Sequence, residues 1–231
     1  MKDLLSNISI NACTSTYLKN PQSSELGQRI VFESVEMIAE MGFEAFTFRK
    51  LGTRLNTSEA SIYRYFESKH KILLYLTSWF WSWMEYRLVF SLSNIENPYE
   101  RLNIAVDLLT MKVNQHYRIS HIDETKLFKI VISESAKSYL SRDVDNSHTS
   151  GVFASYQKLV GRICDIVLEI QPDFKYPNML VTTIIVGSHN QRFFVDHIPG
   201  LTNSLSGEDS ISEFYKQLVF LAINSSTHGR R

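Results

Sequence analysis

The sequence predicts an all-α protein with a small N-terminal three-helix domain and a larger C-terminal helical bundle. Apolar residues recur at helical spacing along most of the 231-residue chain. No stretch shows the sustained apolar/polar alternation of a half-buried strand. The chain is also long for one average domain. We therefore expect an N-terminal arm at 1–24, the small domain at 25–71 and the larger domain at 72–231.

Composition and charge restrict the classes of partner. The 24 basic and 24 acidic residues cancel, so no overall field attracts the molecule to nucleic acid or anionic lipid, and a nucleic-acid surface must be local. Cys13 and Cys164 show neither disulfide-framework nor zinc-site spacing. The most apolar stretch, 72–84, is too short to span a membrane, and no signal-peptide core is visible. We expect a cytoplasmic protein without a membrane partner.

Composition predicts the N-terminal arm, and the spacing of apolar residues predicts the first helix. Residues 1–24 are rich in Ser, Asn and Thr, which predicts a loose arm ending at Pro21. Apolar residues then recur at helical spacing from near Glu25, and Gly42 supplies a glycine stop. A first helix is therefore expected between these positions.

Two short helices and a tight turn follow. Thr47 is a good N-cap for the second helix, and Asn56-Thr57-Ser58 forms the turn. Asn56 tolerates the left-handed backbone conformation. Ser58 can cap a third helix that runs from Glu59 to about Phe66.

A long fourth helix and five later helical segments complete the reading. Ser68 caps the fourth helix, which runs to about Ser91 and carries one apolar stripe. Asn97 and Pro98 mark the next helix start. The remaining apolar-periodic segments lie at about 99–118, 123–140, 150–170, 178–196 and 210–224, and the stretches between them, such as 141–150, are rich in turn residues.

The segment 47–71 is locally basic. Six basic residues (Arg49, Lys50, Arg54, Arg64, Lys69 and Lys71) stand against Glu59 and Glu67, a net +4 within a neutral protein. Phosphate contacts supply most non-specific DNA affinity, so a basic two-helix unit joined by a short turn is suited to the major groove. A charge cluster alone is more often only a solvated face.

The same segment carries a spaced motif. Its residues are Gly42, Phe43, Thr47, Leu51, Gly52, Ser58, Ile62, Tyr63, Tyr65, Phe66, Ser68, Lys69, Leu73 and Leu74. This pattern resembles the N-terminal signature of the tetracycline-repressor-like (TetR) regulators. Departures lie where Gly52 replaces the usual Ala and Leu55-Asn56-Thr57 replaces Ala-Gly-Val.

The resemblance implies a transcription regulator that binds double-stranded operator DNA. The expected DNA-binding residues are Thr47, Arg49, Ser58, Glu59, Ala60, Ser61, Tyr63, Arg64, Tyr65 and Lys69. The first turn of the third helix, 59–61, enters the groove and faces base edges. By resemblance, Tyr63, Tyr65 and Lys69 contact phosphates, as do Thr47 and Arg49. Partial core packing is the alternative for the two tyrosines.

The larger domain is expected to sense a small apolar or aromatic effector. Aromatic residues on the fourth helix could line a cavity, although core filling explains the same stripe. The candidate ligand-binding residues are Trp79, Trp83, Tyr86, Phe128, Tyr156 and His189. The alternative is a DNA-binding protein controlled by a protein partner.

The last two helical segments are expected to form a homodimer interface. In the resembling family, two such helices pack with their symmetry mates as a four-helix bundle. The candidate interface residues are Ile185, Phe193, Phe214, Leu218 and Leu221.

No cofactor, metal or catalytic site is expected. His189 and Asp196 lie on one helix face but two turns apart, too far to share one metal ion without a third element. No phosphate loop, nucleophile elbow or paired-carboxylate motif is present. An enzyme with catalysis in the C-terminal domain is the least favoured alternative.

Overall fold

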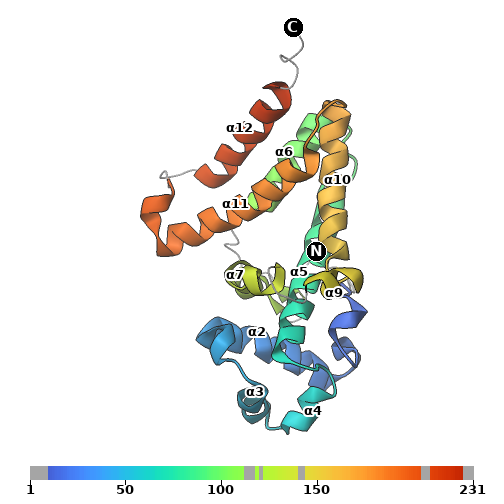
Figure 1. The fold of residues 1–231 in the computed structure, drawn as a ribbon, viewed down its shortest axis with the longest axis vertical. Helices are drawn as coiled ribbons and strands as arrows, with labels where there is room; N and C mark the ends of the chain where they lie inside the picture. The colour runs from blue at the N-terminus through green and yellow to red at the C-terminus, as the bar shows by residue number, and fades with distance from the viewer. Residues whose placement is uncertain (1–9, 112–117, 120–121, 140–143, 204–208, 226–231) are drawn as a thin grey trace. The chain divides into compact units, whose positions relative to one another are not determined.

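The computed structural model describes residues 10–111, 118–119, 122–139, 144–203 and 209–225 (Figure 1). Across these ranges the regular secondary structure is helical apart from one two-residue antiparallel ladder between β1 (Arg118–Ile119) and β2 (Ile122–Asp123). The predicted all-α fold is confirmed. No helix in the described ranges has both the length and the apolar character to cross a membrane.

The described residues form two compact units. One comprises those within 1–83 and 113–155, and the other those within 84–112 and 156–231. The first boundary falls inside one long helix, α5 (Lys69–Ser91). Packing alone defines these units, and the functional division at residue 71 stays a prediction.

The first unit contains three consecutive helices, and two of them start at the predicted caps, Thr47 and Ser58. α2 (Glu25–Ala45) is kinked at Gly42, whose φ of 77° requires the freedom of glycine. α3 (Phe48–Leu55) and α4 (Glu59–Tyr63) follow. α4 ends three residues before the expected Phe66, and residues 64–66 instead form a turn in which the Tyr65 and Phe66 N–H groups bond to the carbonyl of Ile62.

Three later helices belong to the same unit. They are α7 (Glu124–Ser133), α8 (Ser135–Tyr139) and α9 (Val144–Thr149). α7 packs on α2, where Lys126 forms an ion pair with Glu36. α9 corrects the prediction of a turn-rich link at 141–150: Leu74, Val152 and Phe153 form a buried cluster against which Val144 packs. This long-range packing favours a helix that local composition did not indicate.

The N-terminal arm is packed rather than loose between residues 10 and 24. It contains two 3₁₀ turns, η1 (Thr14–Thr16) and η2 (Pro21–Ser23), and buries the side chains of Ile10, Ala12 and Thr16. The prediction of a loose arm is therefore wrong for this stretch, because its polar residues bond to the body of the unit. Residues 1–9 lie outside the described residues.

The second unit is built from four helices besides the end of α5. α6 (Pro98–Thr110) starts at the predicted Asn97 cap, and α10 (Ala154–Ile170), α11 (Pro177–His197) and α12 (Ser210–Ser225) follow, with a 3₁₀ turn η3 (Pro199–Leu201) after α11. α6 packs on both α11 and α12. α6 ends at Thr110, short of the expected 118, and residues 112–117 lie outside the described residues.

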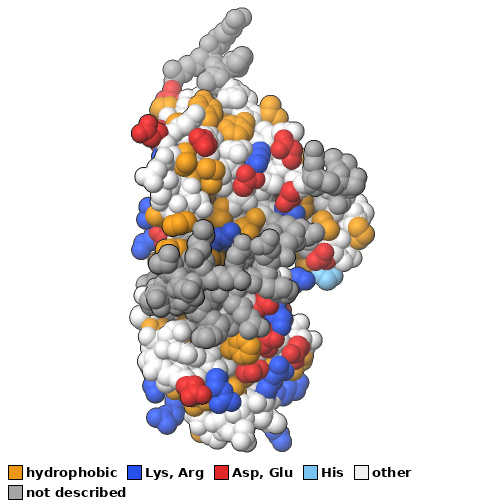
Figure 2. Space-filling model, turned by 180° about the vertical axis from the view of Figure 1, so that it is seen from behind, with side chains coloured by type: hydrophobic (Ala, Val, Ile, Leu, Met, Phe, Trp, Pro, Cys, Tyr) orange, Lys and Arg blue, Asp and Glu red, His pale blue; other side chains and the backbone are white. Residues whose placement is uncertain are grey.

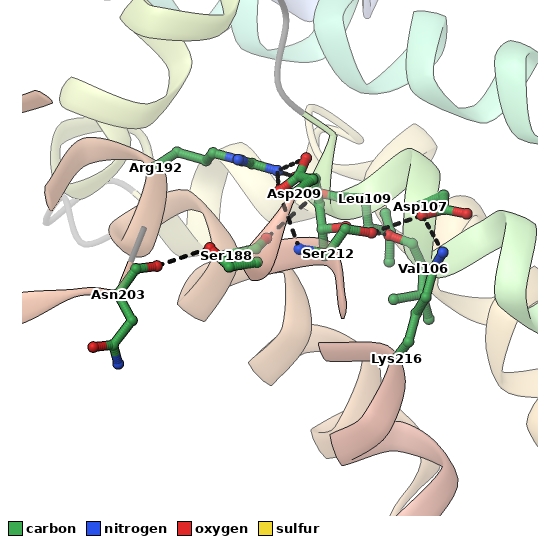
Figure 3. A network of polar contacts seen from close by, with 11 residues as sticks. Val106, Asp107, Leu109, Ser188, Arg192, Asn203, Asp209, Ser212 and Lys216 are labelled. Atoms are coloured by element: carbon green, nitrogen blue, oxygen red, sulfur yellow. Dashed lines mark hydrogen bonds and ion pairs between the residues drawn. The ribbon is translucent and has the colours of Figure 1, made fainter. Parts of the chain in front are cut away.

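A polar network ties α6, α11 and α12 together (Figure 3). The Arg192 guanidinium donates to the main-chain carbonyl of Thr110, at the end of α6, and also to the Asp209 carboxylate just before α12. Asp107 on α6 accepts from Ser212 Oγ at 2.6 Å and from Lys216 Nζ at 2.7 Å. The end of α6 is thereby fixed to both terminal helices.

Candidate nucleic-acid interface

Local capping builds the two-helix unit formed by α3 and α4. Thr47 Oγ1 accepts the N–H of Lys50 at 3.3 Å, and Ser58 Oγ accepts the N–H of Ser61 at 3.2 Å. These bonds satisfy helix N–H groups that have no intrahelical partner. Between the helices, Asn56 has φ 52° and ψ 49°, the left-handed conformation expected for it. The predicted caps and turn are confirmed.

Gly52 allows the turn to lie close against α3. A Cβ at this position would come within 2.9 Å of the Thr57 carbonyl oxygen, which is closer than side chains tolerate. The Thr57 N–H also bonds to the Gly52 carbonyl at 2.9 Å. The two departures from the TetR-like pattern therefore belong to one tight turn: the left-handed Asn56 brings the chain back, and the missing side chain at Gly52 makes room for it.

Most of the predicted DNA-binding side chains are open to solvent. The exposed ones are Thr47, Arg49, Ser58, Glu59, Ala60, Tyr63 and Arg64, and Ser61 is partly exposed. Tyr63 is 48% exposed, and its ring packs edge-on against Phe48 with centroids 4.8 Å apart. Figure 2 shows basic side chains on the lower part of the molecule, where α2 to α4 lie, with acidic side chains among them. This arrangement leaves the first turn of α4 accessible.

Tyr65 does not lie on this surface. It is only 5% exposed, and its hydroxyl shares a hydrogen bond with Ser24 Oγ at 2.8 Å and accepts one from Lys19 Nζ at 3.4 Å. The bond to Ser24 is the main cause that lowers the pKa of Tyr65. This burial and these bonds favour core packing, the alternative for Tyr65, and its phosphate contact stays a prediction.

Lys69 caps the end of α2. Its ammonium group donates to the carbonyls of Phe43 at 3.0 Å and Glu44 at 3.1 Å and lies 4.7 Å from the Phe43 ring centroid. Carbonyls in the last turn of a helix lack intrahelical partners, so these bonds stabilise the helix end. A phosphate contact by Lys69 would have to share or replace them, and that role stays a prediction.

The local charge is smaller than the sequence count of 47–71 suggests. Arg54 forms ion pairs of 2.6 Å with both Glu33 and Glu40 on α2. The hydrogen bond from Arg54 lowers the pKa of Glu40, which keeps that carboxylate ionised. The count missed these partners because they lie earlier in the chain. Arg49 and Arg64 are therefore better candidates than Arg54 for phosphate contacts.

The comparison with protein families matches this part of the chain. Residues 30–76 match the model of the bacterial regulatory proteins of the tetR family. The match contains the whole of α3 and α4, with the caps and turn described above. The segment 30–76 is TetR-like. The search of curated proteins returned no match.

The TetR-like fold extends beyond the matched segment. The superantigen PfiT is 14% identical, with 88% of this chain and 97% of that chain covered and a TM-score of 0.57. A putative transcriptional regulator from Saccharomonospora viridis in complex with choline is 20% identical over 89% and 98%, with a TM-score of 0.54. A regulatory protein of the tetR family from Rhodococcus RHA1 is 14% identical over 87% and 96%, with a TM-score of 0.51. At such identities the likeness shows the fold alone.

The predicted ligand-binding residues divide between the two units. Trp79, Trp83 and Phe128 belong to the first unit, and Tyr86, Tyr156 and His189 to the second. In the first unit, Trp83 Nε1 donates to the buried carboxylate of Glu124 at 3.1 Å. Sequence reasoning missed Glu124, because an acidic residue in the first turn of a helix usually faces solvent.

Burial shifts the pKa of two of these side chains, both in the second unit. It raises the pKa of Tyr156 to about 12 and lowers that of His189 to about 4. His189 is therefore neutral at pH 7. Whether the six residues line a cavity stays a prediction.

The predicted dimer residues separate into a surface set and a buried one. Phe193, Phe214 and Leu221 are exposed, and Leu218 is partly exposed. Ile185 is buried within the second unit, so it supports α11 from inside rather than offering a surface. Sequence reasoning missed Met179 and Val186, both exposed, which precede Phe193 at seven-residue intervals on α11. Such spacing places all three on one helix face.

Proposed function

We propose that this TetR-like chain is a ligand-responsive transcription regulator that binds an inverted-repeat operator as a homodimer and represses transcription. The observation that carries the proposal is the accessible first turn of α4, capped by Ser58 and flanked by Arg49, Tyr63 and Arg64. In a helix-turn-helix, these N-terminal residues of the second helix contact base edges, while flanking side chains contact phosphates.

Each side chain has a distinct proposed role. Ser61 and Ala60 are small and allow close approach to base edges, and Glu59 can accept a hydrogen bond from a cytosine amino group. Arg49, Arg64 and the hydroxyl of Tyr63 contact phosphates and set the orientation of α4 in the groove. Because one short helix reads few bases, specific binding requires two copies on successive major grooves.

The exposed apolar faces of α11 and α12 support dimerisation. Phe214 and Leu221 lie seven residues apart on α12, as Val186 and Phe193 do on α11, and the two helices pack against each other. Adjacent exposed apolar stripes of this kind mark interaction sites more often than free surface. A second copy of the chain would cover both stripes about a two-fold axis.

The proposed effector is a small apolar or aromatic molecule. Within the first unit, the aromatic side chains of Trp79, Trp83 and Phe128 and the buried carboxylate of Glu124 fit a site that is mostly apolar with a polar group for orientation. The similar Saccharomonospora viridis regulator was solved with choline. A thermal-shift screen of the full chain tests this idea: stabilisation without turnover supports a sensor, whereas product formation supports an enzyme.

Selection from random duplex DNA tests the DNA-binding proposal. The full-length protein should enrich an inverted repeat whose half-sites lie about one or two helical turns apart. Enrichment of no sequence, or of a single asymmetric half-site, would contradict the proposal. If the protein enriches no DNA sequence but binds another protein, the fold would serve a protein partner instead of DNA.

A further inference from the structure

We propose that the N-terminal segment 10–24 positions α4 for DNA reading, with Leu18 and Lys19 as positioning residues that act through Tyr65. This inference rests on the proposed function. It concerns a segment that lies outside the matched range 30–76, and it assigns Tyr65 a role other than the expected phosphate contact.

α4 needs support from outside its own hydrogen bonds. It has only five residues, Glu59–Tyr63, whereas isolated helices shorter than about 12 residues are marginal in water. Its N-terminal side is fixed by the tight turn at Gly52, and Ile62 anchors it in the core. Its C-terminal side continues into the turn that holds Tyr65. The position of Tyr65 therefore decides how the end of α4 is held.

The segment 10–24 holds Tyr65 from both main chain and side chain. The Leu18 N–H donates to the Tyr65 carbonyl at 2.7 Å. Ser24 and Lys19 bond to the Tyr65 hydroxyl, and Lys19 Nζ lies 5.0 Å from the ring centroid. The Tyr65 N–H in turn bonds to the carbonyl of Ile62 at 2.9 Å. The segment is thus connected to the last turn of α4 through one residue.

The first half of the segment is fixed to α5. The Cys13 N–H donates to Ser78 Oγ at 2.9 Å, and Lys71 Nζ donates to the Ser15 carbonyl at 3.0 Å. Thr16 is fully buried beside them. In Figure 1 this dark blue segment precedes α2 and lies beside the first half of α5.

The second half is fixed to α2. Ser24 caps this helix by accepting the Gly27 N–H at 3.2 Å. A Cβ at Gly27 would come within 2.3 Å of the Pro21 carbonyl oxygen, so only glycine lets the segment lie so close. With one end held on α5 and the other on α2, the middle of the segment has a defined position from which it holds Tyr65.

A matched pair of variants isolates the main-chain contact. Leu18→Pro removes the N–H that bonds to Tyr65, whereas Leu18→Ala truncates the same side chain, 59% exposed, and keeps the N–H. Tyr17 has φ −142° and ψ 156°, which a residue before proline can adopt. Tyr65→Phe is a second variant that retains the ring and removes both hydroxyl contacts.

The readout is discrimination between DNA sequences together with the mobility of α4. Full-length proteins are titrated with the operator selected by the wild type and with a shuffled duplex, and amide hydrogen exchange is measured at residues 59–66. We expect Leu18→Pro and Tyr65→Phe to lose roughly three- to tenfold in the ratio of operator to shuffled affinity, the equivalent of one hydrogen bond, with faster exchange in α4. Leu18→Ala should behave like the wild type.

The other outcomes distinguish a failure of this inference from a failure of the proposed function. Wild-type discrimination and exchange in both Leu18→Pro and Tyr65→Phe would overturn this inference alone. Equal losses on both duplexes with a smaller salt slope would mean that the segment contacts phosphates directly, which also overturns it. Failure of the wild type to discriminate any sequence would overturn the proposed function, and the inference with it. If Leu18→Pro does not fold, Tyr65→Phe decides the outcome.

Discussion

The guanidinium of Arg54 donates to both carboxylate oxygens of Glu40, at 2.6 and 3.0 Å. A third bond from Arg54 reaches Glu33 at 2.6 Å. All three residues lie within the segment that matches the tetR family model. These ion pairs neutralise one cation of the locally basic segment. Arg54 holds α3 on α2, whereas Arg49 extends into solvent.

Arg49→Ala and Arg54→Ala are therefore expected to affect DNA binding differently. Arg49→Ala should reduce the slope of log affinity against log salt by about 0.9 for each phosphate that Arg49 neutralises, on any DNA sequence. Arg54→Ala should leave that slope unchanged and instead lower the melting temperature, because Glu33 and Glu40 lose their partner. Anisotropy titrations at several salt concentrations measure the slope. An equal slope for wild type and Arg49→Ala would remove Arg49 from the interface.

The left-handed conformation of Asn56 gives a stability prediction. Asn56→Ala should lower the free energy of unfolding by about 1 kcal/mol, because alanine pays the steric cost of that conformation without the local hydrogen bonding of asparagine. Asn56→Gly should be nearly neutral, since glycine adopts the conformation freely. Urea denaturation of both variants measures the difference. Equal stability of the two would contradict the left-handed assignment.

His189 gives a prediction for pH. Burial lowers its pKa from 6.5 to about 4, so between these values the unfolded chain binds a proton that the folded chain does not. The free energy of unfolding should therefore fall as pH drops below 6.5 and be unaffected above it. Between pH 7.5 and pH 5 this contribution amounts to about 2 kcal/mol. In His189→Gln the loss should be smaller by that amount, as urea denaturation at both pH values would measure. The same pH dependence in both proteins would mean that His189 titrates normally.

The local features of this chain could be predicted from sequence. The caps at Thr47, Ser58 and Asn97 and the turn at Asn56 depend on residues within a few positions of each other, so their side-chain chemistry identifies them. The features that the sequence missed depend on distant partners. Tyr65 is buried and bonded to the segment 10–24, and composition alone predicted that segment to be loose.

The lengths of some helices and the pairing of charged side chains also depend on residues far apart in the sequence. α9 forms because the residues beside it are buried against α5, and no periodicity in so short a segment could indicate this. The ion pairs of Arg54 connect α3 to α2. A count of the charged residues in 47–71 could not include these partners, because Glu33 and Glu40 lie outside that segment. The apolar stripe on α11 had the correct spacing, but only the structure distinguishes the exposed Phe193 from the buried Ile185.

Two equally exposed residues of the second unit provide a test of dimerisation. Leu221 on α12 and Phe90 on α5 are each 69% exposed. Leu221→Asp should produce a monomer, because a charge would be buried without a partner in the apolar interface. Phe90→Asp serves as the control and should remain a dimer. Sedimentation equilibrium distinguishes the two masses, and a dimer in both variants would place the interface elsewhere.

Titration of the selected operator against a duplex with one scrambled half-site tests the central claim most directly. We expect two protomers bound per intact operator and an affinity at least about a hundredfold lower when one half-site is scrambled, since only one protomer can then read its bases. Binding of one protomer per duplex, or equal affinity for both duplexes, would contradict the proposal that this TetR-like protein reads an inverted repeat as a dimer.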